Sequence, residues 1–428
     1  MKNATSQPAA PSPRIAQRQR PASPRMARAM CATTLVMLLA GCGGGSDGAE
    51  GDSAAALDPQ LVEQGKSIFR FDTFGDETKW TDTLRMHEVI AAAVDPVTAL
   101  SVGLKVDAQA LPAAVVQGIQ GGTIDLKSPD TTIALLKLDA VVGLKGTVQT
   151  IGGKDRLVRV GVTCALCHST VDDSFAPGIG KRLDGWPNRD LDPGAIIALS
   201  PAIDAASKTV FNSWGKGKYD PRFNQDRLNG PQVIPPAFGL LGIHRITVTG
   251  DGNELAYWNR YVGVTQMGGH GTFSDARIGV NVKNGDDDLV TSKLPALQAY
   301  QLSLPAPLPP AGSFDAAAAQ RGKVVFDGAG RCAQCHSGPE FTDANLRLHS
   351  PSEVVSEPEA PGVPSYASRS ATKQYRTAPL KGVWQHPPYF HNGSAPTLEA
   401  VVRTYDARKG LRLTEAQVQD LVEYLKSL

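Results

Sequence analysis

The sequence predicts a mainly α-helical protein built from two tandem domains, the first of which carries large, loop-rich insertions. Two repeats support this prediction. The pattern Gly-Lys-x-x-Phe occurs at 65–69 and again at 322–326, and the segment 296–304 matches 420–428 in register, with apolar residues spaced as on one helix face. Each pair of repeats encloses one Cys-x-x-Cys-His motif, so the chain contains the same unit twice.

Length, charge and composition limit the classes of protein to consider. With 428 residues, the chain is long enough for two or three domains with cores of their own. It has 43 basic and 42 acidic residues, which argues against a nucleic-acid partner, because nucleic-acid-binding proteins usually carry a basic excess. A hydrophobic content of 41% argues against a disordered chain. We therefore expect a globular protein that binds no nucleic acid.

The first 41 residues have the pattern of a lipoprotein signal peptide. They contain six basic residues and no acidic residue, and they end in a short apolar run at 32–40 that cannot span a bilayer. The segment 38–42 resembles a bacterial lipobox, which implies that Cys42 is lipidated and anchors the protein on the periplasmic side of a membrane. Gly43, where inner-membrane lipoproteins carry Asp, favours the outer membrane.

Two alternatives remain open at this end of the chain. The segment can be an ordinary signal peptide with an incidental cysteine, and Met26 and Met30 are alternative start residues. After Cys42, the Gly-, Ser- and Ala-rich stretch at 42–57 predicts a flexible tether.

The remaining four cysteines form two Cys-x-x-Cys-His motifs, the signature of covalent c-type haem attachment. The two thiols bond to the porphyrin, and the following histidine ligates the iron. A thioredoxin-like pair or half of a zinc site would have to acquire the trailing histidine twice by chance. The sequence therefore predicts two haem c groups. Attachment is expected at Cys164, Cys167, Cys332 and Cys335, with iron ligation by His168 and His336.

The repeats and motifs give the expected domain boundaries. We predict an N-terminal cytochrome c-like haem domain at 58–304, a Pro-rich linker at 305–313 and a C-terminal cytochrome c domain at 314–428. A helix beginning near Ser313 and the C-terminal helix should cross as in a cytochrome c fold. In the first domain, residues 70–163 separate the repeat from the haem motif, whereas 327–331 suffice in the second. A bare electron carrier does not need such an insertion.

The segments 375–384, 388–394 and 397–399 resemble the bacterial di-haem cytochrome c peroxidase superfamily, which includes the MauG-type enzymes that mature a protein-derived quinone. The resemblance is strong over 314–428 and weak over 58–300. It implies that the C-terminal haem accepts electrons from a small donor protein of the cytochrome c or cupredoxin type. It also implies that electrons pass to the N-terminal haem, which reacts with hydrogen peroxide.

The distal ligand of the second haem is the first point where the chain departs from classical peroxidases. After residue 41 the chain has only Met86 and Met267, so the C-terminal domain has no methionine of its own to ligate iron. The resemblance places Tyr405 at the corresponding position, where MauG-type enzymes also have tyrosine. Tyr405 shares a helix face with apolar residues, so a plain core role is the alternative. Other possible ligands are His349, His386 and His391.

The first haem is expected to have an open iron. No histidine occurs at 169–243, where classical peroxidases place a second ligand, so no reductive activation is expected unless a distant residue binds. The resemblance assigns Trp258 as an electron relay and Gln266 as a distal glutamine. The family's distal glutamate is missing nearby, and His270 can replace it as a proton shuttle, ligate the iron, or be structural.

The resemblance also implies a calcium ion between the domains. The backbone carbonyls of His386 and Pro388 match two ligand positions, and Asn229 is a candidate for the side-chain ligand. A Pro-rich turn without metal is the alternative.

Three functions follow from these motifs. The first is a di-haem oxidoreductase of the peroxidase type. The second is a MauG-like or oxygenase-type oxidation of an organic or protein substrate, which the missing methionine and glutamate favour. The third is a non-catalytic di-haem electron carrier with both irons six-coordinate.

Overall fold

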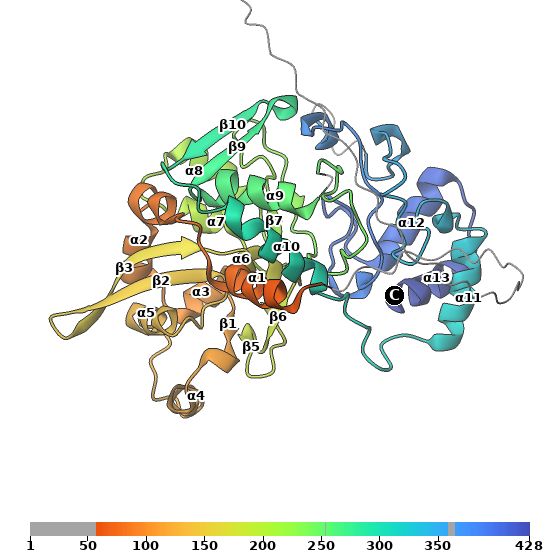
Figure 1. Ribbon diagram of the computed structural model, residues 1–428. Coiled ribbons are helices and arrows are strands. Elements are labelled where there is room, and N and C mark those ends of the chain that lie inside the picture. Colours follow the sequence, from red (N-terminus) through yellow and green to blue (C-terminus); the bar gives the residue numbers. More distant parts are fainter. Residues whose placement is uncertain (1–56, 253, 358–363) are drawn as a thin grey trace, which may run out of the picture. The chain divides into compact units, whose positions relative to one another are not determined.

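The computed structural model describes residues 57–252, 254–357 and 364–428 (Figure 1). The predicted signal peptide and the lipidation at Cys42 lie outside the described residues. The described residues belong to one compact unit. In the described part of the chain, no helix is long and apolar enough to cross a membrane.

The two predicted helix crossings are present. Helix α1 (Pro59–Phe71) packs on α10 (Leu294–Ser303), and α11 (Ala316–Asp327) packs on α13 (Glu415–Lys426). A Cβ atom on Gly65 would lie 1.9 Å from the carbonyl oxygen of Ala296, and one on Gly322 would lie 1.9 Å from that of Asp420. Only glycine permits this approach, so the repeated Gly-Lys-x-x-Phe pattern marks the same close contact in both halves.

Caps and prolines define where these helices begin. Asp58 accepts a hydrogen bond from the backbone N–H of Gln60, and Pro59 follows it at the first helical position. Helix α11 begins after Asp315, which accepts from the N–H of Ala318 at 2.9 Å. The helix therefore begins at Ala316 rather than near Ser313, because Asp315 is the residue whose carboxylate reaches the first turn.

The described chain is a mixture of helices and short strands, and the prediction of a mainly α-helical fold is only partly right. Five two-stranded sheets are present among the described residues. The longest pairs β2 (Leu144–Ile151) with β3 (Lys154–Val162), antiparallel, within the 70–163 insertion. Gly152 and Gly153 form its turn with φ of 61° and 77°, the left-handed conformation that tight hairpins require.

Apart from the 12-residue helix α12, the other elements are shorter (Figure 1). The helices with α labels are α2 (Met86–Ala93), α3 (Pro96–Ser101), α4 (Ala113–Gln120), α5 (Pro129–Lys137), α6 (Ala165–His168), α7 (Pro193–Ala198), α8 (Ala205–Asn212), α9 (Leu255–Tyr261) and α12 (Leu398–Lys409). Short helices labelled η are η1 (Thr78–Thr83), η2 (Ala108–Ala110), η3 (Val262–Met267), η4 (Ala276–Ile278), η5 (Thr291–Lys293), η6 (Cys332–Gln334), η7 (Pro351–Glu353), η8 (Ala367–Arg369) and η9 (Val383–Gln385). The remaining strands are β1 (Val106–Asp107), β4 (Ser169–Val171), β5 (Ile179–Gly180), β6 (Arg182–Asp184), β7 (Lys218–Tyr219), β8 (Gln232–Val233), β9 (Gly271–Asp275) and β10 (Val280–Asn284).

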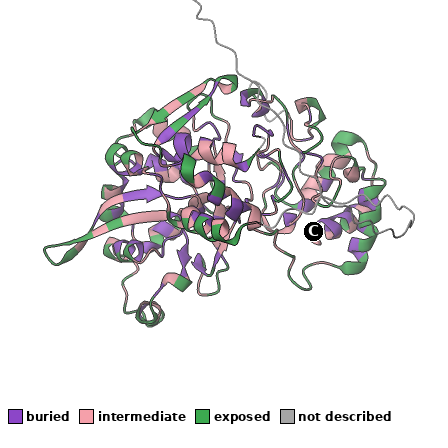
Figure 2. Ribbon diagram, viewed as in Figure 1, coloured by how far each residue is buried: buried purple, intermediate pink, exposed green. Residues whose placement is uncertain are grey.

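The two largest clusters of buried apolar side chains lie one in each half of the chain, before and after the 305–313 segment. One apolar cluster surrounds Phe69 and Tyr261, and a separate one surrounds Phe326 and Val402. Figure 2 shows that the tip of the β2–β3 hairpin is exposed, whereas the end of β3 at 160–162 is buried. This buried end leads directly into the first haem motif, so the insertion anchors that motif.

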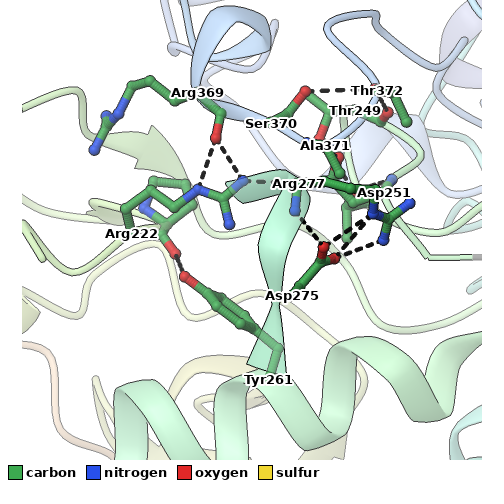
Figure 3. A network of polar contacts seen from close by, with 12 residues as sticks. Arg222, Thr249, Asp251, Tyr261, Asp275, Arg277, Arg369, Ser370, Ala371 and Thr372 are labelled. Atoms are coloured by element: carbon green, nitrogen blue, oxygen red, sulfur yellow. Dashed lines mark hydrogen bonds and ion pairs between the residues drawn. The ribbon is translucent and has the colours of Figure 1, made fainter. Parts of the chain in front are cut away.

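Buried ion pairs join the halves (Figure 3). The Arg222 guanidinium donates two hydrogen bonds, at 3.0 and 2.6 Å, to the carbonyl oxygen of Arg369. The Arg369 guanidinium in turn donates two, both at 3.0 Å, to the carboxylate of Asp220. The backbone N–H of Ala371 donates to Asp251 at 3.0 Å. Residues on both sides of the 305–313 segment therefore share one polar network.

Candidate functional site

The first haem motif presents its histidine as an iron ligand. Helix α6 ends at His168, whose Nδ1 donates to the carbonyl oxygen of Pro235 at 3.0 Å. Because a carbonyl only accepts, Nδ1 carries the proton and Nε2 keeps its lone pair for a metal. Burial lowers the pKa of His168 to about 4, so the imidazole is neutral at physiological pH.

The second motif repeats this arrangement. Nδ1 of His336 donates to the carbonyl oxygen of Phe341 at 3.1 Å, and burial lowers the pKa of the imidazole. A hydrogen bond from the second ring nitrogen to a backbone carbonyl is typical of metal-ligating histidines. Both motifs therefore have the histidine geometry that a c-type haem requires.

The surroundings of the four cysteines favour covalent haem attachment over a thioredoxin-like redox pair or a zinc site. None of the four is in a disulfide. Burial raises the pKa of Cys164 and Cys167 to about 12 and that of Cys332 to about 11, so little thiolate is available for redox exchange. Among the described residues, the one group of His, Cys, Asp and Glu side chains close enough for a metal contains Cys335, Asp343 and His349. It brings together no pair of cysteines, unlike a zinc site.

A cavity lies against the first motif. Cys164, Cys167 and His168 line it, together with apolar side chains such as those of Ile197 and Leu240. Its empty volume, counted together with the solvent at its mouth, is about 1470 Å³. Two thiols, a neutral imidazole and a large apolar cavity fit a covalently bound haem.

Two of the three predicted catalytic residues line this cavity. Trp258 does so from α9, with its ring 4.8 Å from that of Tyr261. Gln266 does so from η3, and its Nε2 donates to the carbonyl oxygen of Pro221 at 2.9 Å. The structure thus brings Trp258 and Gln266 together with the first motif.

The structure places His270 differently. Its Nδ1 lies 2.7 Å from the carboxylate of Asp287, and it is not among the described residues that line the cavity. Gly268, with φ of 92°, ends η3 and turns the chain away before His270. The distal role of His270 stays a prediction that this geometry does not support.

Sequence reasoning missed that the 70–163 insertion supplies part of the cavity wall. Trp80 lines the cavity, and its Nε1 donates to the carbonyl oxygen of Met267 at 2.9 Å. Lys79 Nζ donates to the carbonyl oxygen of Gln266 at 2.5 Å, and burial lowers the pKa of Lys79 to about 8. Segments η1 and η3, joined by these bonds, are both π-helical, a conformation frequent at functional sites.

Tyr405 is the predicted distal ligand at the second motif. Burial, together with the nearby thiols of Cys332 and Cys335, raises the pKa of its phenol to about 12, so the phenol lies near both attachment points. The alternative ligands are engaged elsewhere. Nε2 of His349 lies 3.0 Å from the hydroxyl of Thr377. Ligation by Tyr405 is compatible with this geometry and stays a prediction.

Two further histidines named as alternative ligands also have partners. Nδ1 of His391 lies 3.2 Å from the hydroxyl of Ser356, and Nδ1 of His386 lies 3.1 Å from the carbonyl oxygen of Gly382. Burial and the nearby Arg189 lower the pKa of His386 to about 3.

The candidate calcium ligands are not joined by any described contact. Asn229 accepts from Nε1 of Trp214 at 3.1 Å and donates to the hydroxyl of Ser213 at 2.8 Å. Its amide is therefore engaged within the N-terminal half, and the calcium site with His386 and Pro388 remains a prediction.

An aromatic contact between the halves was also missed. The rings of Trp186 and Trp384 meet edge to face, with centroids 5.9 Å apart. Trp186 follows Gly185, whose N–H donates to the carbonyl oxygen of His168 at 2.8 Å. Trp384 lies in η9, and its Nε1 donates to the carbonyl oxygen of Pro307 at 3.2 Å. The contact therefore begins next to the first motif and ends in the C-terminal half.

Comparisons with known proteins agree with this geometry. A family model described as RoxA-like, cytochrome c-like matches residues 374–411. Cytochrome-c peroxidase IdrP1 of Denitromonas iodatirespirans is 29% identical over 151 residues. Over this segment the chain is similar to a cytochrome c peroxidase. Cytochrome-c peroxidase IdrP2 of a Pseudomonas species, strain SCT, is 29% identical over 143 residues. These matches support the resemblance to the di-haem cytochrome c peroxidase superfamily.

The similarity to each relative is partial. The alignment covers 26% of this chain and 40% of the first relative, and 26% and 39% for the second. Two solved structures share 20% sequence identity with the chain. Hydrazine synthase of Kuenenia stuttgartiensis has a TM-score of 0.31, covering 50% of this chain and 74% of its own. A MauG-like protein associated with microbial copper homeostasis has a TM-score of 0.32, covering 46% and 73%. TM-scores of this size do not establish a shared fold.

Proposed function

We propose that the chain is a di-haem c-type cytochrome oxidoreductase of the peroxidase type, anchored by lipid at Cys42 on the periplasmic side of a bacterial membrane. Electrons from a small donor protein enter at the C-terminal site and pass to the N-terminal site, where hydrogen peroxide is reduced. Each peroxide takes up two electrons and two protons and leaves as two water molecules.

One observation carries this proposal. A single large cavity contains both attachment thiols, the neutral imidazole of His168 and the side chains of Trp258 and Gln266. Among the described residues that line it, His168 is the one histidine, so no second imidazole is placed to block the iron. With haem bound in this cavity, no second imidazole from the described lining would compete with a small oxidant for the iron that His168 would hold.

The side chains of this cavity have distinct proposed roles. Bound haem supplies the redox centre. Gln266 is held by the bond from its Nε2 to Pro221, which leaves its amide oxygen free to accept a hydrogen bond from an O–H group of peroxide. Trp258 provides an aromatic surface on the cavity wall for electron transfer. Lys79 and Trp80 hold the carbonyls of η3, so they position Gln266 rather than touch the substrate.

One observation favours oxidation of an organic or protein substrate as a second candidate function. The described lining of the cavity has no aspartate or glutamate, although peroxide reduction needs a proton donor. Slow turnover of peroxide would leave oxidation of an organic or protein substrate as the main use of the site.

The spin state of the purified holoprotein tests the proposal against a non-catalytic carrier. Two haems per chain and a high-spin component are expected, because the first iron is open. The thioether of Met267 is the group that would close it, since this residue lines the cavity and His–Met ligation is typical of electron carriers. A wholly low-spin wild type that becomes high-spin on Met267→Leu would show that the protein is a carrier. The same spectrum in both proteins is expected here.

A further inference from the structure

Arg376 belongs to the C-terminal half, yet it lines the cavity of the first motif. It follows Tyr375, which pairs with His349 through a β-bridge, and its own N–H donates to the carbonyl oxygen of Val248 at 2.7 Å. Among the described lining residues, Arg376 is the one lysine, arginine, aspartate or glutamate. A permanent positive charge therefore faces an otherwise uncharged cavity.

This charge has no counter-ion in the described part of the chain. Nη1 donates to the carbonyl oxygen of Arg245 at 3.0 Å, and Nε is buried without a hydrogen-bond partner. Burial lowers the pKa of Arg376 to about 10, which still leaves the guanidinium charged at physiological pH. A buried charge without a partner is strongly unfavourable, so the folded protein needs an anion at this position.

Two other arginines of this region, Arg369 and Arg222, have carboxylate partners, whereas Arg376 has none in the described part of the chain. Arg369 pairs with Asp220 at 3.0 Å and with Asp226 at 2.8 Å, and Arg222 lies 3.6 Å from Asp251. Figure 3 shows Arg222 bonded to the carbonyl oxygen of Arg369, within the network that joins the halves. Arg376 lies in the same joint between the halves and is the one of the three arginines that faces the cavity instead of a carboxylate.

We propose that Arg376 binds a propionate carboxylate of the haem attached at Cys164 and Cys167, so that the C-terminal half completes the first haem site. The inference rests on the proposed function, which places that haem in the cavity. A guanidinium matches a carboxylate in charge and in its paired donors, and haem carries two carboxylates into a cavity that offers no other anion. A positive charge at this edge of the haem stabilises the reduced state and raises its midpoint potential.

The test measures the midpoint potential of the first haem in holoprotein by spectroelectrochemistry. Arg376→Met should lower it, whereas Arg376→Lys, which keeps the charge, should retain most of the wild-type value. Arg403→Met is the matched control, because Arg403 is exposed on α12 and pairs with Glu399 and Glu415. Its midpoint should equal that of the wild type. An unchanged midpoint in Arg376→Met, with both haems present, would overturn the inference.

Two further measurements distinguish a failure of the proposed function from a failure of the inference about Arg376. The haem content of the wild type tests the proposed function alone, since a chain without haem at the first motif fails before Arg376 is considered. Succinate tests whether the carboxylate comes from a soluble acid. If the potential of the wild type and Arg376→Met differs only when succinate is added, Arg376 binds a soluble acid and the proposal is wrong. A difference already present in plain buffer is the expected result.

Discussion

Removing the Arg369 guanidinium should destabilise the protein strongly, because it lies at the centre of the joint between the halves. Its side chain is 4% exposed, and it bonds to Asp220, whose side chain is 0% exposed. Arg369→Met leaves the carboxylate of Asp220 with only the backbone N–H groups of Arg222 and Gly230 as donors. The carbonyl of Arg369 that accepts from Arg222 is retained, so the change isolates the side-chain charge.

The expected magnitude follows from the cost of a buried charge that has lost its partner. Breaking a buried ion pair from one side costs about 3–5 kcal/mol. The two backbone donors that remain on Asp220 place this case near the lower end, at about 3 kcal/mol. Guanidinium chloride unfolding of the holoprotein, followed by tryptophan fluorescence, measures the free energy of unfolding. The double variant Arg369→Met, Asp220→Asn should recover part of the loss, because it removes the orphaned charge.

The control for this prediction is Arg403→Met, which breaks an exposed ion pair and should leave the free energy of unfolding close to that of the wild type. If Arg369→Met lost less than about 1 kcal/mol, the buried network would not hold the halves together and the reasoning would fail.

Three further predictions concern the haem sites. Tyr405→Phe should change the optical spectrum of the second haem while the first is unaffected, and an unaltered spectrum would assign Tyr405 to the core. Lys79 has a pKa lowered to about 8 by burial, against an unfolded value of 10.5, so the native state releases this proton first and stability should rise with pH across that interval. Lys79→Met should remove that rise, and equal slopes in both proteins would contradict it. Trp258→Phe and Trp384→Phe should each slow electron transfer between the haems, measured by flash photolysis of the half-reduced protein. If one of these variants transfers electrons at the wild-type rate, the tryptophan that it lacks does not carry the electron.

The parts of the fold that could be predicted depend on patterns local in sequence. The helix crossings could be predicted because Gly65 and Gly322 occupy the same position in the repeated sequence pattern. A Cβ atom on either residue would lie 1.9 Å from a backbone carbonyl oxygen of the crossing helix. The β2–β3 hairpin was missed although its signal was present. Segments in which apolar and polar residues alternate flank Gly152 and Gly153, and this arrangement is typical of a tight hairpin.

The cavity shows why spatial neighbours are harder to predict. Trp258 and Gln266 were identified through a resemblance, and both line the cavity. His270 follows only four residues after Gln266, but the left-handed Gly268 redirects the chain toward Asp287. Arg376 and Trp80 reach the cavity from the C-terminal half and the 70–163 insertion. No local periodicity reveals such contacts, because they depend on how distant segments pack.

A peroxide titration of the fully reduced holoprotein tests the central claim most directly. The proposed function predicts that one equivalent of hydrogen peroxide removes two electrons, seen as loss of the ferrous haem bands with an endpoint at one peroxide per chain. Gln266→Ala should slow the reaction without changing this stoichiometry. If hydrogen peroxide left the spectra of the ferric, half-reduced and reduced forms unchanged, the first haem would not be an open redox site and the peroxidase proposal would be wrong.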